Sequence, residues 1–192
     1  NQKKTKKKYI VYLDTGTPYF LGDAPSVRRK PPIVNLKNYY KDLNLFFDQI
    51  EKIFRAKVIV IPHSKYKITK LKNKNLNPYF NNRLSDNSFN AAAKLIPKSL
   101  FVISLGSTAL SHAVINYKPI QYIYSSNYKH EWNQRSELKN VLAQANSTGA
   151  KPIDIISIKK NFLNSNLKVN KAKYDLYKFK YLTYKSAKPA KP

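Results

Sequence analysis

One stretch, residues 100–124, constrains the fold of this chain more than any other. It opens with the apolar run FVISL, which is typical of a strand buried on both faces of a parallel sheet. Gly106 permits a sharp turn, and Ser107 and Thr108 are frequent helix N-cap residues. Pro119 ends the helix, and residues 120–124 predict a second strand. The stretch therefore predicts a β-α-β unit whose helix has an apolar face at spacings of three and four, namely Ala109, Leu110, Ala113, Val114 and Tyr117.

Alternating strand and helix patterns continue along the rest of the chain. This alternation predicts an α/β fold: a doubly wound, mainly parallel, Rossmann-like sheet with right-handed crossovers and helices on both faces. We expect one face of the helix 38–54 to pack on the core, and likewise one face of the helix 135–145. These faces are Leu43, Phe46, Phe47, Ile50, Ile53 and Phe54 in the first helix, and Leu138, Val141 and Leu142 in the second. The other predicted strands cover residues 9–13, 57–61 and 153–158, and further helices end at Leu95 and follow residue 173.

The chain of 192 residues suffices for one hydrophobic core. We expect a single α/β domain over residues 9–186, a basic N-terminal extension at 1–8 and a tail at 187–192 whose composition is typical of disorder. The first residue is Asn rather than Met, which suggests a fragment of a longer protein. The absence of cysteine excludes disulfides, thiolate metal ligands and a thiol nucleophile.

The turn at Gly106, Ser107 and Thr108 is a candidate anion site. The N–H groups at a helix N-terminus and the helix dipole together favour phosphate or carboxylate, and the two hydroxyls add donors. Ser107 acting as a cap alone is the simpler interpretation. His63 is a second candidate, because a residue just past the carboxyl end of a parallel strand faces the crevice where α/β proteins bind ligands. Lys65 and Ser125 are candidates to line the same cleft.

A wider pattern surrounds this turn. The residues LIPKS at 95–99, a buried strand, Gly-Ser-Thr-Ala and then Asn-Tyr-Lys-Pro-Ile resemble the nucleotide-binding half of GT-B glycosyltransferases, most closely the bacterial enzymes of capsule and surface polysaccharide synthesis. The resemblance covers residues 9–184 and is strongest at 95–125. It implies that Gly106, Ser107 and Thr108 hold the phosphate of a nucleotide-sugar donor.

The same resemblance suggests roles for residues in two other loops. The family carries acidic residues in its first loop, so Asp14 and Asp23 are candidates for contacting donor or acceptor, although Asp14 also suits a turn cap. The family binds donor phosphate with a His-Pro pair where this chain has Pro62 before His63, so the geometry of this loop departs from the family pattern.

The chain lacks an Asp-x-Asp pair, and its three histidines are far apart in sequence. We therefore expect no metal site and no cofactor, with the nucleotide-sugar as substrate and the glycan acceptor as second partner. In the resembled enzymes the general base comes from the other half of the molecule. The catalytic residues thus stay unassigned, and we leave open whether this chain alone is an enzyme. The resemblance implies a cytoplasmic protein, or one at the inner face of the cell membrane.

The net charge of +26 favours anionic partners such as phosphorylated substrates, nucleic acid or an anionic membrane surface. A compositional bias towards Lys, Asn and Ile accounts for it equally well. Nucleic-acid binding is the alternative function, supported by the charge and by tyrosines interleaved with lysines near the C-terminus. Those tyrosines recur at helical spacing, which favours packing against the domain instead; they are Tyr174, Tyr177, Tyr181 and Tyr184.

Overall fold

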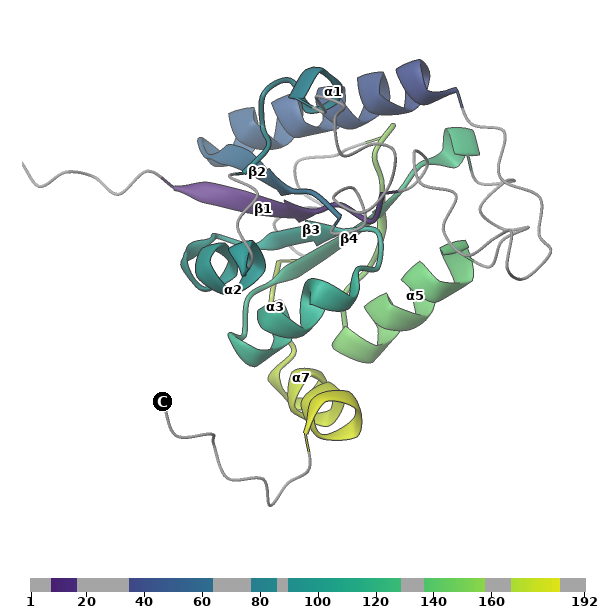
Figure 1. Cartoon of the computed structure of the whole chain (residues 1–192). Helices are drawn as coiled ribbons and strands as arrows, with labels where there is room; N and C mark the ends of the chain where they lie inside the picture. Colours follow the sequence, from purple (N-terminus) through teal and green to yellow (C-terminus); the bar gives the residue numbers. More distant parts are fainter. Residues whose placement is uncertain are drawn as a thin grey trace, which may run out of the picture.

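The structure is a computed structural model that describes residues 8–16, 35–63, 77–85, 90–128, 137–157 and 167–183. Its centre is a five-stranded sheet in the order β2-β1-β3-β4-β5, and every neighbouring pair is parallel (Figure 1). This confirms the predicted α/β, Rossmann-like class. The strands are β1 (Tyr9–Leu13), β2 (Lys57–Ile61), β3 (Val102–Ser104), β4 (Ile120–Tyr124) and β5 (Ile153–Asp154).

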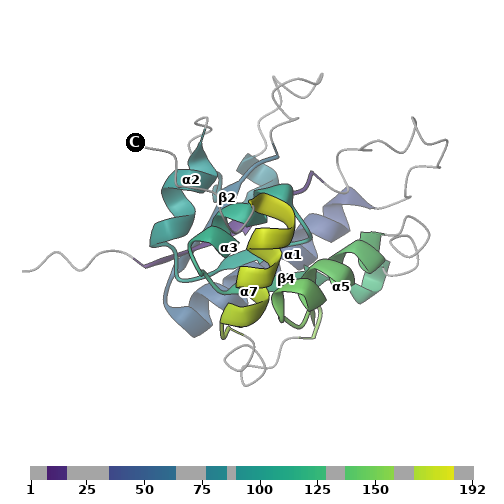
Figure 2. The same ribbon diagram turned by 90° about the horizontal axis from the view of Figure 1, so that it is seen from below.

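Helices cover both faces of this sheet. The long helix α1 (Leu36–Phe54) lies across one face, and the other helices lie across the opposite face, with α7 between α3 and α5 when seen from below (Figure 2). These are α2 (Ala91–Leu95), α3 (Ser111–Ile115), α5 (Glu137–Thr148) and α7 (Lys171–Tyr177). The short 3-10 turns are η2 (Asn77–Phe80), η3 (Ile96–Lys98), η4 (Thr108–Leu110) and η5 (Ser126–Tyr128), and η6 (Lys178–Leu182) is a π-helical turn.

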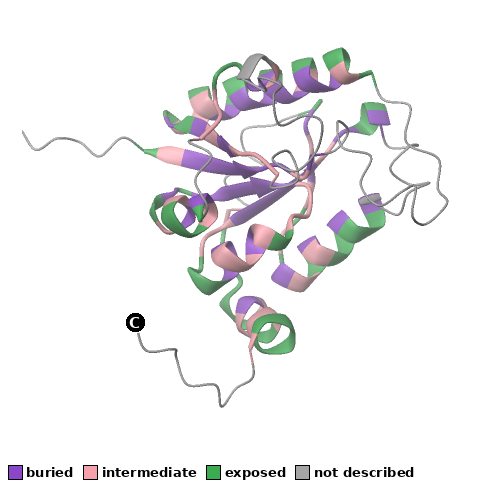
Figure 3. Cartoon of the chain, viewed as in Figure 1, coloured by how far each residue is buried: buried purple, intermediate pink, exposed green. Residues whose placement is uncertain are grey.

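The strands separate two clusters of buried side chains, one beneath each helical layer. Figure 3 shows the central strands mostly coloured as buried, and the helices with buried and exposed stretches. α1 contributes the largest share to the first. Four of its six predicted inward residues are at most 1% exposed, whereas Ile53 and Phe54 at its C-terminal end are only partly buried against the cluster. Burial of each of the four fully buried side chains stabilises the fold by about 1.5–3 kcal/mol. These residues are Leu43, Phe46, Phe47 and Ile50. Within the described residues no helix is both long and apolar enough to cross a bilayer.

Two predictions about the C-terminal part are corrected. Leu142 is 47% exposed, whereas Val141 is 3% exposed, so the apolar face of α5 runs through Leu138, Val141 and Ala145 instead. The last strand ends at Asp154 rather than Ile158, because the Asp154 carboxylate accepts a hydrogen bond from the Ile156 N–H and turns the chain.

The helix after Gly106 also differs from its prediction. It begins as the 3-10 turn η4 and continues as α3, which ends at Ile115. Tyr117 then takes a left-handed conformation with φ of 47° and is 38% exposed, so it does not belong to the buried face. Its side chain instead hydrogen-bonds to the carboxylate of Asp175 on α7. Leu110, Ala113 and Val114 are buried as predicted.

Candidate functional site

The order of the strands defines one crevice at the edge of the sheet. β1 connects through α1 to β2 on one side, and β3 pairs with the other side of β1. The chain therefore crosses over in opposite directions on the two sides of the β1–β3 pair. In open α/β sheets such a switch point leaves a crevice outside the carboxyl ends of the strands, and ligands bind there.

The strand register brings the sequence candidates to this edge. Leu13 at the end of β1 is in register with Ile61 of β2 and with Ser104 of β3. Two residues further along these strands come His63, Thr15 and Gly106, and Ser125 directly follows β4. With neighbouring strands about 4.8 Å apart, the whole group spans roughly 15 Å of the edge. The prediction that His63 and Ser107 share the carboxyl edge of a parallel sheet is confirmed.

Ser104 shapes the turn at the centre of this group. Its side chain is fully buried, and its hydroxyl oxygen accepts hydrogen bonds from the N–H groups of Gly106 and Ser107, both at 3.0 Å. This corrects the expectation that the Ser107 amide points outward to a ligand. Ser104 was not among the candidates predicted from the sequence. A serine two or three residues before an N–H group can accept a local side-chain-to-backbone hydrogen bond, and this was the signal that could have identified it.

Gly106 is required by the backbone of this turn. Its φ of 107° lies in the region that L-residues rarely adopt. A Cβ at this position would also approach the Gln144 side-chain oxygen to 3.4 Å. Gln144 comes from α5, so the helix after β4 packs against the turn after β3. A Cβ at position 106 would make only an ordinary contact with this side chain, so the positive φ is what requires glycine.

Ser107 is the N-cap of η4. Its hydroxyl accepts a hydrogen bond from the Ala109 N–H at 3.2 Å, which confirms the capping role. Thr108, the first residue of η4, is exposed. Its N–H has no preceding helical carbonyl to bond, so it is the backbone donor of this turn that a ligand can reach.

Two hydroxyls flank the turn. Ser125 is completely buried, and its oxygen has no hydrogen-bond partner among the described residues. The buried hydroxyl of Thr15 is likewise unpartnered within that part of the chain. Such groups cost free energy unless a ligand or water bonds them. Thr15 was not singled out in the sequence, because a threonine in a turn carries no distinctive signal.

Asp14 has the capping role that the sequence left open. It is 4% exposed, and one carboxylate oxygen accepts a hydrogen bond from the Gly16 N–H at 3.1 Å. Its own N–H donates to the Ile61 carbonyl, which ties the ends of β1 and β2 together. The side chain therefore holds the first loop at the crevice. Asp23 and Lys65 lie outside the described residues.

Helix dipoles add positive potential at the same edge. Each helix that links two parallel strands must run back across the sheet, so α1, η4 with α3, and α5 all begin at the carboxyl edge. The Asn35 side chain caps α1 by accepting from the Asn38 N–H. Each helix N-terminus is equivalent to about half a positive charge, which favours an anionic ligand here.

Two cavities on the described part of the surface lie away from the carboxyl-edge crevice. A cavity of about 940 Å³ borders β2 at the opposite, amino edge of the sheet, and another of about 590 Å³ lies along α1. Neither is lined by His63 or Ser107 within the residues the structure describes. Residues 17–34 and 64–76, which follow β1 and β2 in the sequence, lie outside that description. The crevice therefore rests on topology, register and side chains rather than on a cavity volume.

The C-terminal tyrosines pack on the domain. Tyr174 is 3% exposed, donates to the Lys118 carbonyl and stacks on Tyr117. Burial raises the pKa of its hydroxyl. Tyr177 is half-buried, whereas Tyr181 is exposed and Tyr184 lies outside the described residues. Packing thus explains the inner part of the stripe, which removes Tyr174 as a surface for stacking bases.

Comparisons with known proteins give little beyond this geometry. No family model and no curated protein matches the chain. Among solved structures, the crystal structure of the glycotransferase of kitacinnamycin aligns with a TM-score of 0.40 and 10% identity. The alignment covers 84% of this chain and 34% of that one, so this chain spans about a third of that protein's length.

Proposed function

We propose that this chain is the donor-binding domain of a GT-B type glycosyltransferase, which transfers sugar from a nucleotide-sugar to a surface polysaccharide. One observation carries the proposal: a glycine turn, two unpartnered buried hydroxyls and a histidine follow four adjacent parallel strands at the topological switch point. The resemblance of residues 95–125 to the nucleotide-binding half of these enzymes supports the choice of ligand.

The proposed site binds the donor diphosphate with neutral and weakly basic groups. The exposed Thr108 N–H and the helix N-termini offer donors and positive potential. The hydroxyls of Thr15 and Ser125 supply hydrogen bonds that the described residues leave unmade. His63 donates from the neighbouring strand. Because these dipoles are fixed before the ligand arrives, they stabilise a departing diphosphate without rearrangement.

Transfer also requires a base for the acceptor hydroxyl. The only described carboxylate assigned to this crevice is that of Asp14, which already caps a turn. In this proposal the domain therefore binds donor and requires a second domain for turnover. A protein with this role works where nucleotide-sugars are made, at the inner face of the cell membrane.

A thermal-shift panel of UDP-, GDP- and CMP-sugars tests the proposal. We expect one nucleotide class to raise the melting temperature in a dose-dependent way, since a ligand that binds only the folded state stabilises it by mass action. His63→Ala should weaken this response more than Ser107→Ala, because Ser107 uses its hydroxyl as a cap. A panel in which no sugar nucleotide shifts the transition would contradict the proposal.

A further inference from the structure

The cavity of about 940 Å³ at the amino edge of the sheet is lined by an unusual concentration of cations. Its volume lies within the range of small-molecule pockets. Among the described residues, five basic side chains and one carboxylate, that of Glu51, border it. The basic side chains come from four segments of the chain: the residue before β1, the junction between α1 and β2, the loop after η2, and α2. The basic residues are Lys8, Arg55, Lys57, Arg83 and Lys94.

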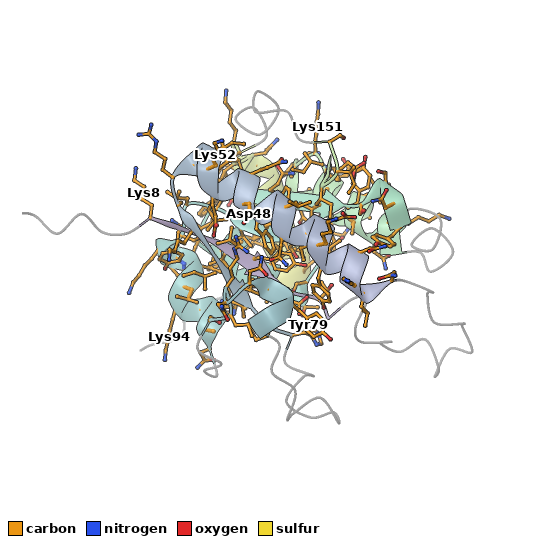
Figure 4. The ribbon with its side chains drawn as sticks, turned by 90° about the horizontal axis from the view of Figure 1, so that it is seen from above. Lys8, Asp48, Lys52, Tyr79, Lys94 and Lys151 are labelled. Atoms are coloured by element: carbon orange, nitrogen blue, oxygen red, sulfur yellow. The ribbon has the colours of Figure 1, made fainter. Side chains whose placement is uncertain are left out.

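Among the described residues, only one of these five cations forms an ion pair. Arg83 is held by Glu51 and Asp48, and its side chain is only 10% exposed. Lys8, Arg55, Lys57 and Lys94 form no ion pair with any other described residue. Lys8 and Lys57 are close neighbours, since the Lys57 N–H donates to the Lys8 carbonyl. Lys8 and Lys94 reach outward at the same end of the molecule (Figure 4).

The helix dipole explains only part of this concentration. α1 ends beside the cavity, and its carbonyl end carries about half a negative charge, which one or two cations balance. The remaining cations repel one another. Arg55 takes a left-handed conformation with φ of 49° because it is the C-cap of α1, where its N–H donates to the Glu51 carbonyl. An anion relieves the crowding of like charges at this cavity.

The rest of the lining shows what kind of anion fits. Apolar side chains of β2, of the loop after η2 and of α2 also line the cavity, which suits a ligand with a nonpolar portion. The hydroxyl of Ser85 lines the cavity and has no hydrogen-bond partner in the described part of the chain. The apolar lining residues are Ala56, Val58, Ile59, Leu84, Ala91 and Leu95.

An added peptide strand does not fit here, although β2 is an edge strand. The Val60 N–H and carbonyl already pair with the backbone of residues 83–85. The Val58 N–H, which faces the same way, donates to the Glu51 carboxylate at 2.7 Å. These bonds occupy the groups that a further strand would need.

We propose that this cavity is a second ligand site, separate from the carboxyl-edge crevice, and that it binds an organic phosphate. Arg55, Lys57 and Lys94 contact the phosphate group, and β2 and Leu84 contact the nonpolar portion of the ligand. Phosphate suits a cavity bordered by several cations, because it presents up to two negative charges and several acceptor oxygens. The phosphate comes either from a soluble metabolite or from a lipid headgroup.

Calorimetric titration of inorganic pyrophosphate into the full chain at low ionic strength tests the site. The background is Gly106→Val, which removes the proposed donor site. Lys57→Gln/Lys94→Gln should weaken pyrophosphate binding about tenfold or more, since each substitution removes a charge-assisted hydrogen bond that contributes to the affinity. The matched control, Lys139→Gln/Lys171→Gln, removes the same charge from exposed positions that do not line the cavity and should change affinity by no more than about twofold.

Sedimentation with vesicles of phosphatidylglycerol or phosphatidylcholine distinguishes the source of the phosphate. One outcome supports the site with a lipid headgroup as its ligand. The chain then binds phosphatidylglycerol vesicles but neither phosphatidylcholine nor pyrophosphate, and the Lys57→Gln/Lys94→Gln substitutions weaken this binding whereas the control substitutions do not. Equal losses in both pairs would show a general charge effect and overturn the proposal. So would the absence of binding to both pyrophosphate and phosphatidylglycerol.

Discussion

Ser104 is the residue on which the geometry of the candidate site depends most. Its hydroxyl collects the N–H groups of Gly106 and Ser107, so it sets the turn that places Thr108 at the crevice. The sequence predicted the turn from Gly106 and the cap from Ser107, and both are confirmed. It did not predict which backbone N–H groups of the turn remain free to bind a ligand. That depends on the buried hydroxyl of Ser104, and apart from its spacing to the turn nothing in the sequence distinguishes this serine from any other strand residue.

Ser104→Ala should lower the free energy of unfolding by about 2–3 kcal/mol, because it leaves two amides without their acceptor. Ser99→Ala is the control: Ser99 is also buried, but its hydroxyl only donates one bond to the Ile96 carbonyl. We expect about 1 kcal/mol for that variant. Urea denaturation measures both. Equal losses in the two variants would show that Ser104 does not organise the turn.

At the scale of elements, an ion-pair network fastens the segment after η2 to α1. Arg83 donates two hydrogen bonds to Glu51, one to Asp48 and one to Asn44. Glu51 also accepts from the N–H of Val58 in β2. The sequence indicated only a polar, irregular segment here, since contacts between residues some 30 positions apart leave no local pattern.

This network predicts a loss of stability in acid. Burial alone would raise the pKa of Glu51, but its hydrogen bonds from Arg83 and Val58 and the nearby charges of Arg83 and Lys57 lower it on balance. A carboxylate with a lowered pKa in the folded state stabilises the fold above its unfolded pKa, and this contribution is lost as the pH falls below about 4.5. Glu51→Gln should therefore flatten the pH dependence of the unfolding free energy between about pH 5 and pH 3. This window spans the usual Glu pKa of about 4.3 and the range just below it.

Asp48→Asn is the matched comparison for Glu51→Gln. Asp48 also pairs with Arg83, but its side chain is 57% exposed against 27% for Glu51. Exposed pairs contribute about 0–1 kcal/mol, so this variant should keep most of the acid sensitivity. If Asp48→Asn flattens the pH profile as much as Glu51→Gln does, burial does not distinguish the two carboxylates.

The orientation of α5 gives a second test at this scale. The sequence pattern placed both Val141 and Leu142 inward, whereas only Val141 is buried. Val141→Ala should cost about 1.6 kcal/mol for the two buried carbon groups it removes. Leu142→Ala should stay within about 0.5 kcal/mol, as exposed substitutions do. Thermal unfolding checks the pair, and the reverse order would show that α5 is rotated from its position here.

At the scale of the whole molecule, the parallel sheet and its two helical layers follow from patterns that are local in sequence. Buried strands read as apolar runs, and α1 reads as a stripe at spacings of three and four. The crevice follows from these only through strand order, because the order decides which carboxyl ends become neighbours. The cationic cavity at the amino edge could not be predicted, since its lining residues come from separate segments that each look like ordinary basic surface.

The proposed donor site predicts binding that does not need a divalent metal. Among the described residues no three His, Asp or Glu side chains come together as metal ligands, and the sequence contains no Asp-x-Asp pair. Sugar-nucleotide affinity should therefore be unchanged in excess chelator, because the dipoles and hydroxyls of the crevice act on the phosphate directly. Affinity that disappears in chelator and returns with magnesium or manganese would contradict this account.

The most direct measurement of the central claim is calorimetric titration of a UDP-, GDP- or CMP-sugar into the wild-type chain, Gly106→Val and Gly149→Ala. Both glycines have positive φ, so each substitution strains the fold. Gly149 follows α5, away from the carboxyl edge, and is the control. We predict that one sugar nucleotide binds wild type and Gly149→Ala alike and that Gly106→Val loses the binding. If Gly106→Val binds as tightly as wild type, or if no sugar nucleotide binds the wild-type chain, the carboxyl-edge crevice is not a donor site.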